Sequence, residues 1–593
     1  MPASRDPALP VSRRALLGGL AAGAAGATSG CLQRMQTLAT REDPQQVRLE
    51  VKTVPADDDP AATRIGRALE DNLAAVGIDT DRVLLKEAEL RRDVLVNRDF
   101  DIFVGRYPAY EGPDFLRTLL HSKFTNESGW QNPYGFTDLD VDELLEAQRS
   151  QTGLDRSATV SELQQEVARE QPFVTVAIPD DIHAIRADRF QGFEGFPVQS
   201  TLCLLALDYV GNDDRTLRLA ATDGRVTRNL NPIAVEYRTR GTVTGLLYDP
   251  LARWYDGAVR PWLAAGWEES SDTDNRQITV ELRDGLAWHD GTGLTADDVE
   301  FTYRFLQDTR LGEREPPVPA PRFRSQSSLV DDVERLDRQH VRLTFSNTGP
   351  QLALAALTVP ILPVSEWKDT ASDAEFGGVS ASDHVTEALV WPNAEPVGSG
   401  PFQFDERTAG EELRLSRFDD HFLDGSGENQ PHRFGGGIPF EQLRVDVVRS
   451  DEAAVLLVEE GSADATVSAL RPGVIPTIGQ RNDLQLQVDE PQSFYQVGFN
   501  TQRRPLGNPH IRRAVARLLD KEYIAREVFD GFAQPVASPL ARTDWETPAL
   551  QWNGSDPEVP FFGTGGDLDA TAARAAFRDA GFEYDEDGTL LHR

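Results

Sequence analysis

The chain has 593 residues, enough for several hydrophobic cores, and carries 96 acidic against 60 basic side chains, a formal net charge of −36. So large an excess of negative charge repels nucleic acid and opposes compact folding unless dissolved salt screens it. Because the acidic residues are spread over the whole sequence, we interpret the chain as a halophilic, haloarchaeal protein. An acidic surface reserved for a cationic partner is the alternative.

The first residues predict export and lipid anchoring. A twin-arginine signature at Arg13–Arg14 is followed by an apolar run that ends at Ala27 and is too short to span a membrane. Small residues then precede Cys31, as in a lipobox, so Cys31 is predicted to become the lipidated first residue of the mature protein. We assign residues 1–30 to a twin-arginine lipoprotein signal and residues 31–46 to a tether on the outer face of the cytoplasmic membrane.

Strands and helices are predicted to alternate in the next part of the chain. The segment VRLEVKTV, which begins at Val47, predicts a strand, and a helix is expected over 63–76 because Gly77 can end it. Further apolar segments follow, up to the strand sequence FVTVAIP, which ends at Pro179. Cys203, the other cysteine, lies in an apolar run and is predicted to be a buried thiol, so a disulfide framework is excluded.

Residues 248–306 predict a strand, a turn and a capped helix in one continuous run. Apolar and polar residues alternate over 278–282, as in a half-buried strand, and Asp290 begins an Asp-Gly turn pair. Thr295 is expected to cap the following helix, with Asp298 completing a capping box. The histidine before Asp290 could form an acid–base pair with it, but a structural turn is the interpretation we favour.

Four later segments continue the α/β pattern. A Gly-Ser-Gly turn is predicted at 398–400, and a helix that leads into a strand at 456–466. Asn508 is expected to cap a helix that has proline at its first position. The last helix is predicted over 570–580, with a glycine directly after it.

Taken together, these segments resemble the family-5 solute-binding proteins, the extracytoplasmic receptors of peptide, nickel and oligosaccharide ABC importers. The resemblance covers most of residues 47–593. It implies a two-lobe α/β periplasmic-binding-protein (Venus flytrap) fold of the large peptide-binding type.

The implied function is that of a monomeric receptor that captures a peptide-like or other small organic solute and delivers it to ABC permease subunits. Alternatives are a binding-only sensor or scavenger, or a receptor for an oligosaccharide or a metal chelate. We expect no enzymatic activity, cofactor, metal or nucleic-acid partner, because the sequence has no HExxH, P-loop, G-x-S-x-G or Cys/His cluster.

The order of the segments differs from that of the family. The run 248–306 resembles the family's opening part, yet about 200 residues precede it, and residues 47–186 resemble the family's last part. We therefore predict a circular permutation in which the family's termini are joined near residues 205–217. The strand from Val47 should then pair with the segment after Gly588. A fused partial duplicate is the alternative, although no segment is repeated.

The resemblance also implies how the chain divides into lobes. Lobe II is expected to combine residues 47–173 with residues 490–593, and lobe I to span residues 174–489. Crossing strands are expected at 174–179 and 494–500, with the ligand in a cleft between the lobes.

The expected cleft departs from the pattern of the peptide-binding members, W-x-x-D-Y-x-D-P-x-x-F-L. Arg106 stands at the tryptophan position and Ala109 at the position of the aspartate that pairs with a peptide's amino group. Glu111 could replace that aspartate, whereas Arg106 could bind a carboxylate or phosphate, or pair with Glu111 or Asp114. The candidate ligand-binding residues are Arg106, Tyr110, Glu111, Trp130, Asn132, Tyr248, Trp391, Ser399, Phe494 and Tyr495.

Overall fold

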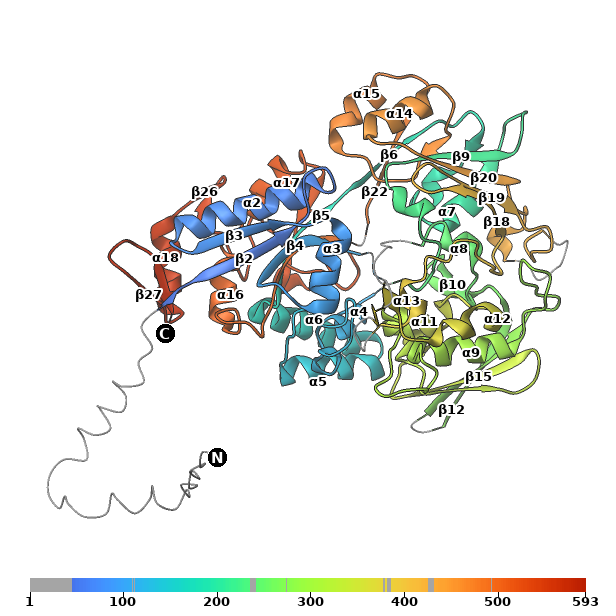
Figure 1. Cartoon of the computed structure of the whole chain (residues 1–593), viewed down its shortest axis with the longest axis horizontal. Coiled ribbons are helices and arrows are strands. Elements are labelled where there is room, and N and C mark those ends of the chain that lie inside the picture. Colours follow the sequence, from blue (N-terminus) through green and yellow to red (C-terminus); the bar gives the residue numbers. More distant parts are fainter. Residues whose placement is uncertain are drawn as a thin grey trace, which may run out of the picture.

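The structure is a computed structural model. It describes residues 45–108, 110, 112–234, 241–272, 275–376, 379–380, 385–424, 431–491 and 493–592. Figure 1 shows two bodies side by side, one built from both ends of the described chain and one from its middle. Their main hydrophobic cores are separate. We call the first body lobe II (described residues of 45–179 and 494–592) and the second lobe I (described residues of 181–489).

Lobe II is built around a six-stranded sheet of order β24-β5-β23-β4-β2-β3. The strands β3, β2 and β4 run parallel, and β23, β5 and β24 continue the sheet in antiparallel pairing. The strands are β2 (Arg48–Thr53), β3 (Asp79–Leu84), β4 (Ile102–Tyr107), β5 (Phe173–Pro179), β23 (Phe494–Phe499) and β24 (Ala533–Pro535). The helices are α2 (Pro60–Ala75), α3 (Glu87–Arg92), α4 (Phe115–Leu120), α5 (Leu139–Ser150), α6 (Gly153–Glu170), α16 (Pro509–Ala516), α17 (Lys521–Glu527) and α18 (Ala570–Asp579).

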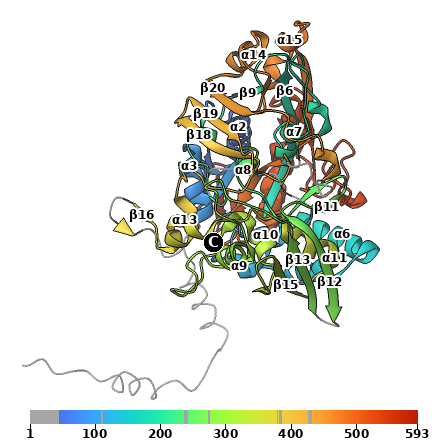
Figure 2. The same ribbon diagram turned by 90° about the vertical axis from the view of Figure 1, so that its right-hand side faces the viewer.

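Lobe I contains a seven-stranded sheet of order β18-β19-β20-β9-β21-β6-β22 and a four-stranded sheet of order β12-β13-β15-β14. Figures 1 and 2 show α14 and α15 at one end of the lobe and the four-stranded sheet at the other. The larger sheet comprises β6 (Asp181–Ile185), β9 (Thr216–Ala221), β18 (Phe402–Thr408), β19 (Glu412–Arg417), β20 (Gln442–Val447), β21 (Ala465–Thr466) and β22 (Gln485–Asp489). The smaller sheet comprises β12 (Ala264–Asp272), β13 (Asn275–Leu282), β14 (Asp332–Arg335) and β15 (His340–Ser346).

The helices of lobe I are mostly short. They are α7 (Thr201–Leu205), α8 (Thr244–Leu247), α9 (Ala296–Gln307), α10 (Arg324–Ser327), α11 (Pro350–Ala355), α12 (Val364–Trp367), α13 (Glu387–Val390), α14 (Asp451–Glu459) and α15 (Ile475–Gly479). Two-stranded pairs complete the fold: β7 (Phe190–Gln191) with β8 (Asp208–Tyr209), β10 (Ala252–Tyr255) with β11 (Ala258–Pro261), β16 (Glu375–Phe376) with β17 (Val379–Ser380), and, in lobe II, β25 (Gly563–Thr564) with β26 (Asp567–Leu568).

Capping groups confirm most of the predicted helix ends, but α2 begins at Pro60, three residues before the predicted start at residue 63. The Asp59 side chain accepts a hydrogen bond from the Ala62 N–H ahead of α2, and Gly77 follows that helix with φ +85°. Thr295 forms the expected capping box of α9 with Asp298. Asn508 caps α16 as predicted, with Pro509 as the first residue of the helix, which ends at Ala516.

Two short connections join the lobes. One runs from β5 to β6 through Asp180, and the other runs from β22 to β23 after Asp489. Val174 and Ile178 pack in the core of lobe II, so the first change of lobe falls after Pro179 and not at residue 174 as expected.

The two ends of the described chain lie together on lobe II. β1 (Gln45–Gln46) pairs with β28 (Leu590–His592), which pairs in turn with β27 (Glu583–Tyr584), and the Val47 N–H donates to the Leu590 carbonyl at 2.8 Å. The prediction that the strand from Val47 pairs with this segment is therefore wrong for the strand itself, since only Gln45, Gln46 and the Val47 N–H meet β28. β2 itself does not extend it, because β2 lies between β3 and β4 in the six-stranded sheet.

Two further sequence predictions concern membranes and cysteine. Within the described residues, no helix combines the length and the apolar character that crossing a membrane requires. Cys203 is buried as predicted, and burial raises the pKa of its thiol to about 12. The twin-arginine signature and Cys31 lie outside the described residues.

Candidate functional site

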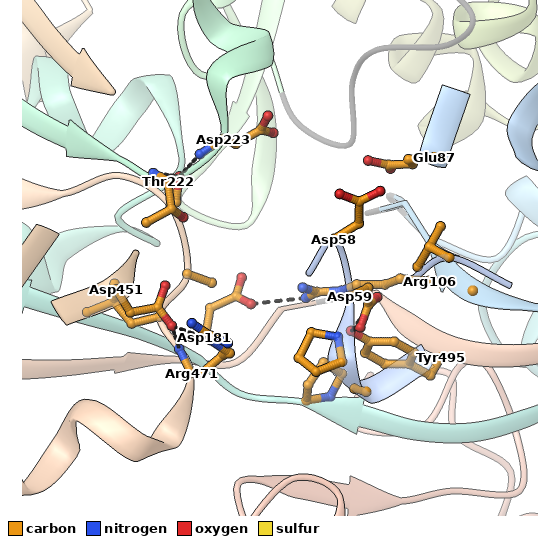
Figure 3. A pocket seen from close by; sticks show the side chains of 18 of the residues that line it. Asp58, Asp59, Glu87, Arg106, Asp181, Thr222, Asp223, Asp451, Arg471 and Tyr495 are labelled. Atoms are coloured by element: carbon orange, nitrogen blue, oxygen red, sulfur yellow. Dashed lines mark hydrogen bonds and ion pairs between the residues drawn. The ribbon is translucent and has the colours of Figure 1, made fainter. Parts of the chain in front are cut away.

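A cavity of about 800 Å³ lies between the lobes, where the two connections cross. Lobe II contributes the loop after β2, the end of β4 and helix α3, and lobe I contributes the segments that follow β9, β20 and β21. In both lobes these are the carboxyl ends of parallel strands, the edge at which α/β sheets commonly bind ligands. Figure 3 shows the labelled charged side chains on the two walls.

Arg106 lies on the lobe II wall, at the crossing of the chain. Its Nη2 donates to Asp181 Oδ1 at 3.0 Å (Figure 3). Nη2 also donates to Ser493 Oγ at 2.7 Å, and Nε donates to the same hydroxyl at 3.0 Å. Burial by itself would lower the pKa of Arg106, but the Asp181 carboxylate raises it above its ordinary value. Of the alternatives for Arg106, pairing with Asp114 is wrong, because Asp114 binds Arg149 instead.

Asp59 and Tyr495 form a hydrogen-bonded pair beside Arg106. The Tyr495 hydroxyl lies 2.9 and 3.1 Å from the two carboxylate oxygens of Asp59 and donates to them. Burial raises the pKa of the Asp59 carboxyl, although the hydrogen bonds from Ala62 and Tyr495 and the nearby Arg106 act in the opposite direction. One carboxylate thus caps α2 and lines the cavity.

Glu87 connects the two walls of the cavity. It binds Arg225 of lobe I, and it also binds Arg91 one helical turn further along α3, at 2.5 Å. Arg225 is held in turn by Asp223 at 2.7 Å. Burial would raise the pKa of Glu87, but the two guanidinium groups lower it below its ordinary value. An ionised carboxylate therefore links the lobes across the cavity at neutral pH.

The described lining carries ten carboxylate and six guanidinium groups, so the cavity is negative overall. Most of the guanidinium groups already have partners inside the protein; Arg471, for example, binds Asp451 at 2.6 Å. Five of these carboxylates make no ion pair with any described residue: Asp57, Asp58, Asp59, Glu452 and Asp530. Of these, Asp59 is held by the Tyr495 hydroxyl, and Glu452 lies in the field of Arg471.

Three of the predicted site residues meet at this cavity. They are Arg106, Trp130 and Tyr495. Trp130 contributes part of the apolar wall, where its ring packs edge-on against Tyr107 at 4.9 Å and near Phe103 at 6.4 Å.

Three other predicted residues lie in the core of lobe II. Tyr110 donates its hydroxyl to the Pro539 carbonyl and stacks on Phe115, with the ring centres 4.1 Å apart. Phe494 is buried and stacks on Tyr107 at 5.1 Å. Asn132 stabilises a turn by exchanging hydrogen bonds with the backbone of Phe136. Ala109 and Glu111 lie outside the described residues.

The remaining three predicted residues pack in lobe I. The Tyr248 hydroxyl accepts from Asn393 Nδ2 at 2.7 Å, and Ser399 Oγ accepts from the Asp249 N–H at 3.3 Å. Trp391 packs edge-on against Trp367 at 5.2 Å. The Ser399 bond and the hydrogen bond from the Gly400 N–H to the Leu247 carbonyl, at 2.9 Å, hold the Gly-Ser-Gly turn against α8, and the same turn binds the His289 ring.

Sequence reasoning missed most of the charged lining. Asp57, Asp58 and Asp59 form an acidic run between β2 and α2. Their position after a predicted strand was a usable signal, because loops at the carboxyl ends of parallel strands gather at one edge of a sheet. Glu87 and Arg225 also follow parallel strands, β3 and β9, but their contact joins residues 138 positions apart in the chain, and no local pattern predicts it.

The sequence model of the bacterial extracellular solute-binding proteins, family 5 middle, matches residues 258–592, more than half of the chain. The chain is 26% identical over 285 residues to the oligopeptide-binding protein AppA of Bacillus subtilis, across 48% of this chain and 45% of AppA. It is also 26% identical over 319 residues to the peptide transport periplasmic protein SapA of Salmonella typhimurium, across 51% of this chain and 53% of SapA. The chain thus spans about half the length of the curated relatives it matches.

Among solved structures, that of AppA from Bacillus subtilis in complex with a nonapeptide aligns with 64% of this chain and 67% of its own length. The sequence identity is 19% and the TM-score is 0.47.

Proposed function

Because the chain belongs to the bacterial extracellular solute-binding proteins of family 5, we propose that it is an extracytoplasmic receptor of an ABC importer. The proposed receptor captures a peptide-like or other small organic solute and delivers it to the permease, without enzymatic activity. The cavity between the lobes carries this proposal, since a site built from two lobes can enclose its ligand when they close. A volume of about 800 Å³ suits a solute of the size of a short peptide.

The charge of the lining supports a solute that carries at least one cationic group. An anionic solute would meet more carboxylates than guanidinium groups, and Arg106, the expected anion site, already binds Asp181. Asp58 projects from the lobe II wall in Figure 3 and makes no ion pair with a described residue. An ammonium or guanidinium group of the solute is therefore favoured beside it.

Mass spectrometry of the native protein, kept in high salt until the measurement, tests the receptor function directly. We expect a co-purifying organic solute that is released on denaturation. Binding of trilysine, trialanine and triglutamate, followed by thermal shift, then tests the charge preference. We expect Asp58→Asn to weaken trilysine binding by about tenfold, the value of one charge-assisted hydrogen bond, whereas Asp155→Asn on an exposed face of lobe II leaves it unchanged. Tighter binding of triglutamate would contradict the charge assignment.

We also propose export by the twin-arginine route and anchoring through Cys31. The motivation is the order of twin arginine, short apolar run and cysteine in the sequence. Arg13→Lys with Arg14→Lys should leave the protein in the cytoplasm, and Cys31→Ser should release it from membranes into the medium. Membrane association of the serine variant equal to that of the wild type would exclude the lipobox.

We further propose that the chain is a circular permutation of the family fold. The pairing of β1 with β28 and the mixture of strands from both ends of the chain in the six-stranded sheet support this proposal. A crystal structure superposed on an unpermuted relative without regard to chain order tests it. Residues 47–186 should fall on the relative's C-terminal part. If they fall on a segment that later residues already occupy, the chain is a partial duplicate.

A further inference from the structure

The backbone pairing between the two connections is interrupted where the chain passes from one lobe to the other. On the lobe II side, β5 and β23 pair up to Ala177 and Tyr495. On the lobe I side, β6 and β22 pair from Asp181 and Asp489. Between these points no described backbone hydrogen bond joins one connection to the other. Any change in the angle between the lobes therefore has to bend the chain in this short gap.

Arg106 bridges the gap by side-chain contacts. Its guanidinium binds Asp181, at the end of the first connection, and Ser493, in the second, with donor–acceptor distances of 2.7 to 3.0 Å. It projects from β4 of lobe II, whose position is fixed by pairing with β23. One side chain of lobe II thus holds both connections.

Arg542 makes a second bridge from a different segment of lobe II. Its Nη1 lies 3.1 Å from Asp180 Oδ1 in the first connection, and its Nη2 lies 2.6 Å from Glu490 Oε2 in the second. The Arg542 backbone has φ +64°, a region that residues other than glycine rarely adopt. Burial would lower its pKa, but Glu490 and Asp180 raise it, so the guanidinium remains charged between its partners.

We propose that Arg106 and Arg542 are positioning residues that clamp the two connections together and so set the angle between the lobes. A planar guanidinium suits this role because its fork of donors reaches two acceptors at a fixed spacing. Lysine, a single point charge, can hold only one of them well.

The two halves of the clamp differ in their access to a bound solute, and this part rests on the proposed receptor function. Arg106 lines the cavity, whereas Arg542 is not among the described lining residues. A charged group of a solute that reaches this point exchanges partners with Arg106 or Asp181, while the Arg542 half stays intact. The Arg106 half of the clamp thus couples the binding of a solute in the cavity to the angle between the lobes.

Hydrogen exchange of the dialysed full-length protein, without added solute, tests the clamp. We expect Arg542→Gln to speed amide exchange roughly tenfold in peptides covering 178–186 and 486–498, because charge-assisted bonds on both connections are lost. Small-angle X-ray scattering should show a larger radius of gyration for Arg542→Gln combined with Arg106→Gln. Arg542→Lys should restore part of the protection.

Arg503→Gln is the matched control, because Arg503 also bridges two carboxylates, Asp99 and Asp101, but within lobe II. It should leave exchange at both connections unchanged. Glu490→Gln keeps the assay informative if an arginine variant fails to fold, since the Glu490 side chain is 71% exposed. Wild-type exchange in both Glu490→Gln and Arg106→Gln would overturn the clamp. No solute is involved, so this result is independent of the receptor proposal.

Discussion

His289 shows how one side chain can fix a turn that lies more than a hundred residues away. Its Nδ1 accepts from the Gly398 N–H at 3.1 Å, and its Nε2 lies 2.9 Å from the Gly400 carbonyl and donates to it. Acceptance at Nδ1 requires the neutral ring with its proton on Nε2, because a protonated ring donates from both nitrogens. Burial lowers the pKa of His289 to about 4, so the ring is neutral throughout the physiological range. The motif is therefore a structural turn, as the sequence interpretation held, and not an acid–base pair.

Acid should destabilise lobe I through this histidine. Its pKa is about 6.5 in the unfolded chain and about 4 in the fold, so the unfolded state binds more protons between these values. The stabilisation is complete above pH 6.5 and is lost as the pH falls to 4, by up to about 3 kcal/mol. Thermal unfolding between pH 4 and 7 in molar KCl should show a shallower pH dependence for His289→Gln than for the wild type. The exposed His510→Gln should follow the wild-type curve, and parallel curves for all three proteins would refute this role.

At the residue scale, sequence reasoning identified individual site residues better than it identified the residues that they contact. Arg106 was identified by its place in a family motif, and the structure puts it on the cavity wall. Its partners Asp181 and Ser493 are 75 and 387 residues away in the chain. No local pattern encodes contacts of that separation. The aromatic candidates Tyr110 and Phe494 were more difficult, because a buried ring and a ligand platform look alike in sequence.

At the element scale, the Gly-Ser-Gly turn needs its glycines for close packing. A Cβ atom on Gly398 would lie 1.8 Å from the Leu247 carbonyl oxygen, and one on Gly400 would lie 2.2 Å from the Leu246 carbonyl oxygen. These distances are far below van der Waals contact, and the obstacle is backbone, which cannot turn aside. The turn thus packs directly against the backbone of α8. It also binds His289, which lies shortly before the capped helix α9.

Gly400→Ala should therefore destabilise lobe I by about 3 kcal/mol or more, since the backbone of α8 must shift. Gly266→Ala in β12 is the matched control, because its Cβ would meet no atom within 4 Å, and it should change stability by no more than about 1 kcal/mol. Urea unfolding followed by circular dichroism measures both. Equal midpoints for the two variants would show that the turn can yield.

The elements with strong local signals were predicted correctly. The capping box of α9, the Asn508 cap of α16 and the alternating strand β13 follow from short-range chemistry. The order of strands within each sheet was not predictable in the same way, because β5 joins β23 and β24 across more than three hundred residues. Family resemblance, not periodicity, supplied the two-lobe arrangement.

At the scale of the whole molecule, the net charge of −36 requires screening. The Debye length falls from about 10 Å at 0.1 M salt to about 3 Å at 1 M, so molar salt suppresses repulsion between surface carboxylates. The ion pairs that link the lobes, such as Glu87 with Arg225, are partly buried and are weakened less. High salt thus favours the compact state overall.

Dilution into low salt should unfold the protein. The midpoint of thermal unfolding is expected to fall steadily as KCl is reduced from about 2 M to below 0.1 M, because self-repulsion grows as screening is lost. Sucrose at matched water activity is the control, since it stabilises by exclusion without screening charge. Equal stability in dilute and molar KCl would contradict the halophilic interpretation.

The pairing of Gln45 with His592 has a mechanical consequence. The polypeptide enters and leaves the folded part at the same edge of lobe II, far from α14 and α15 in Figure 1. Any attachment through the N-terminal residues therefore holds lobe II in place and leaves lobe I as the part that can move. Lobe I is joined to lobe II by the two connections and by ion pairs such as Arg225 with Glu87 and Arg324 with Glu127. Opening and closing would then move lobe I relative to an anchored lobe II. A reporter fused after His592 would stay with lobe II and would not follow that movement.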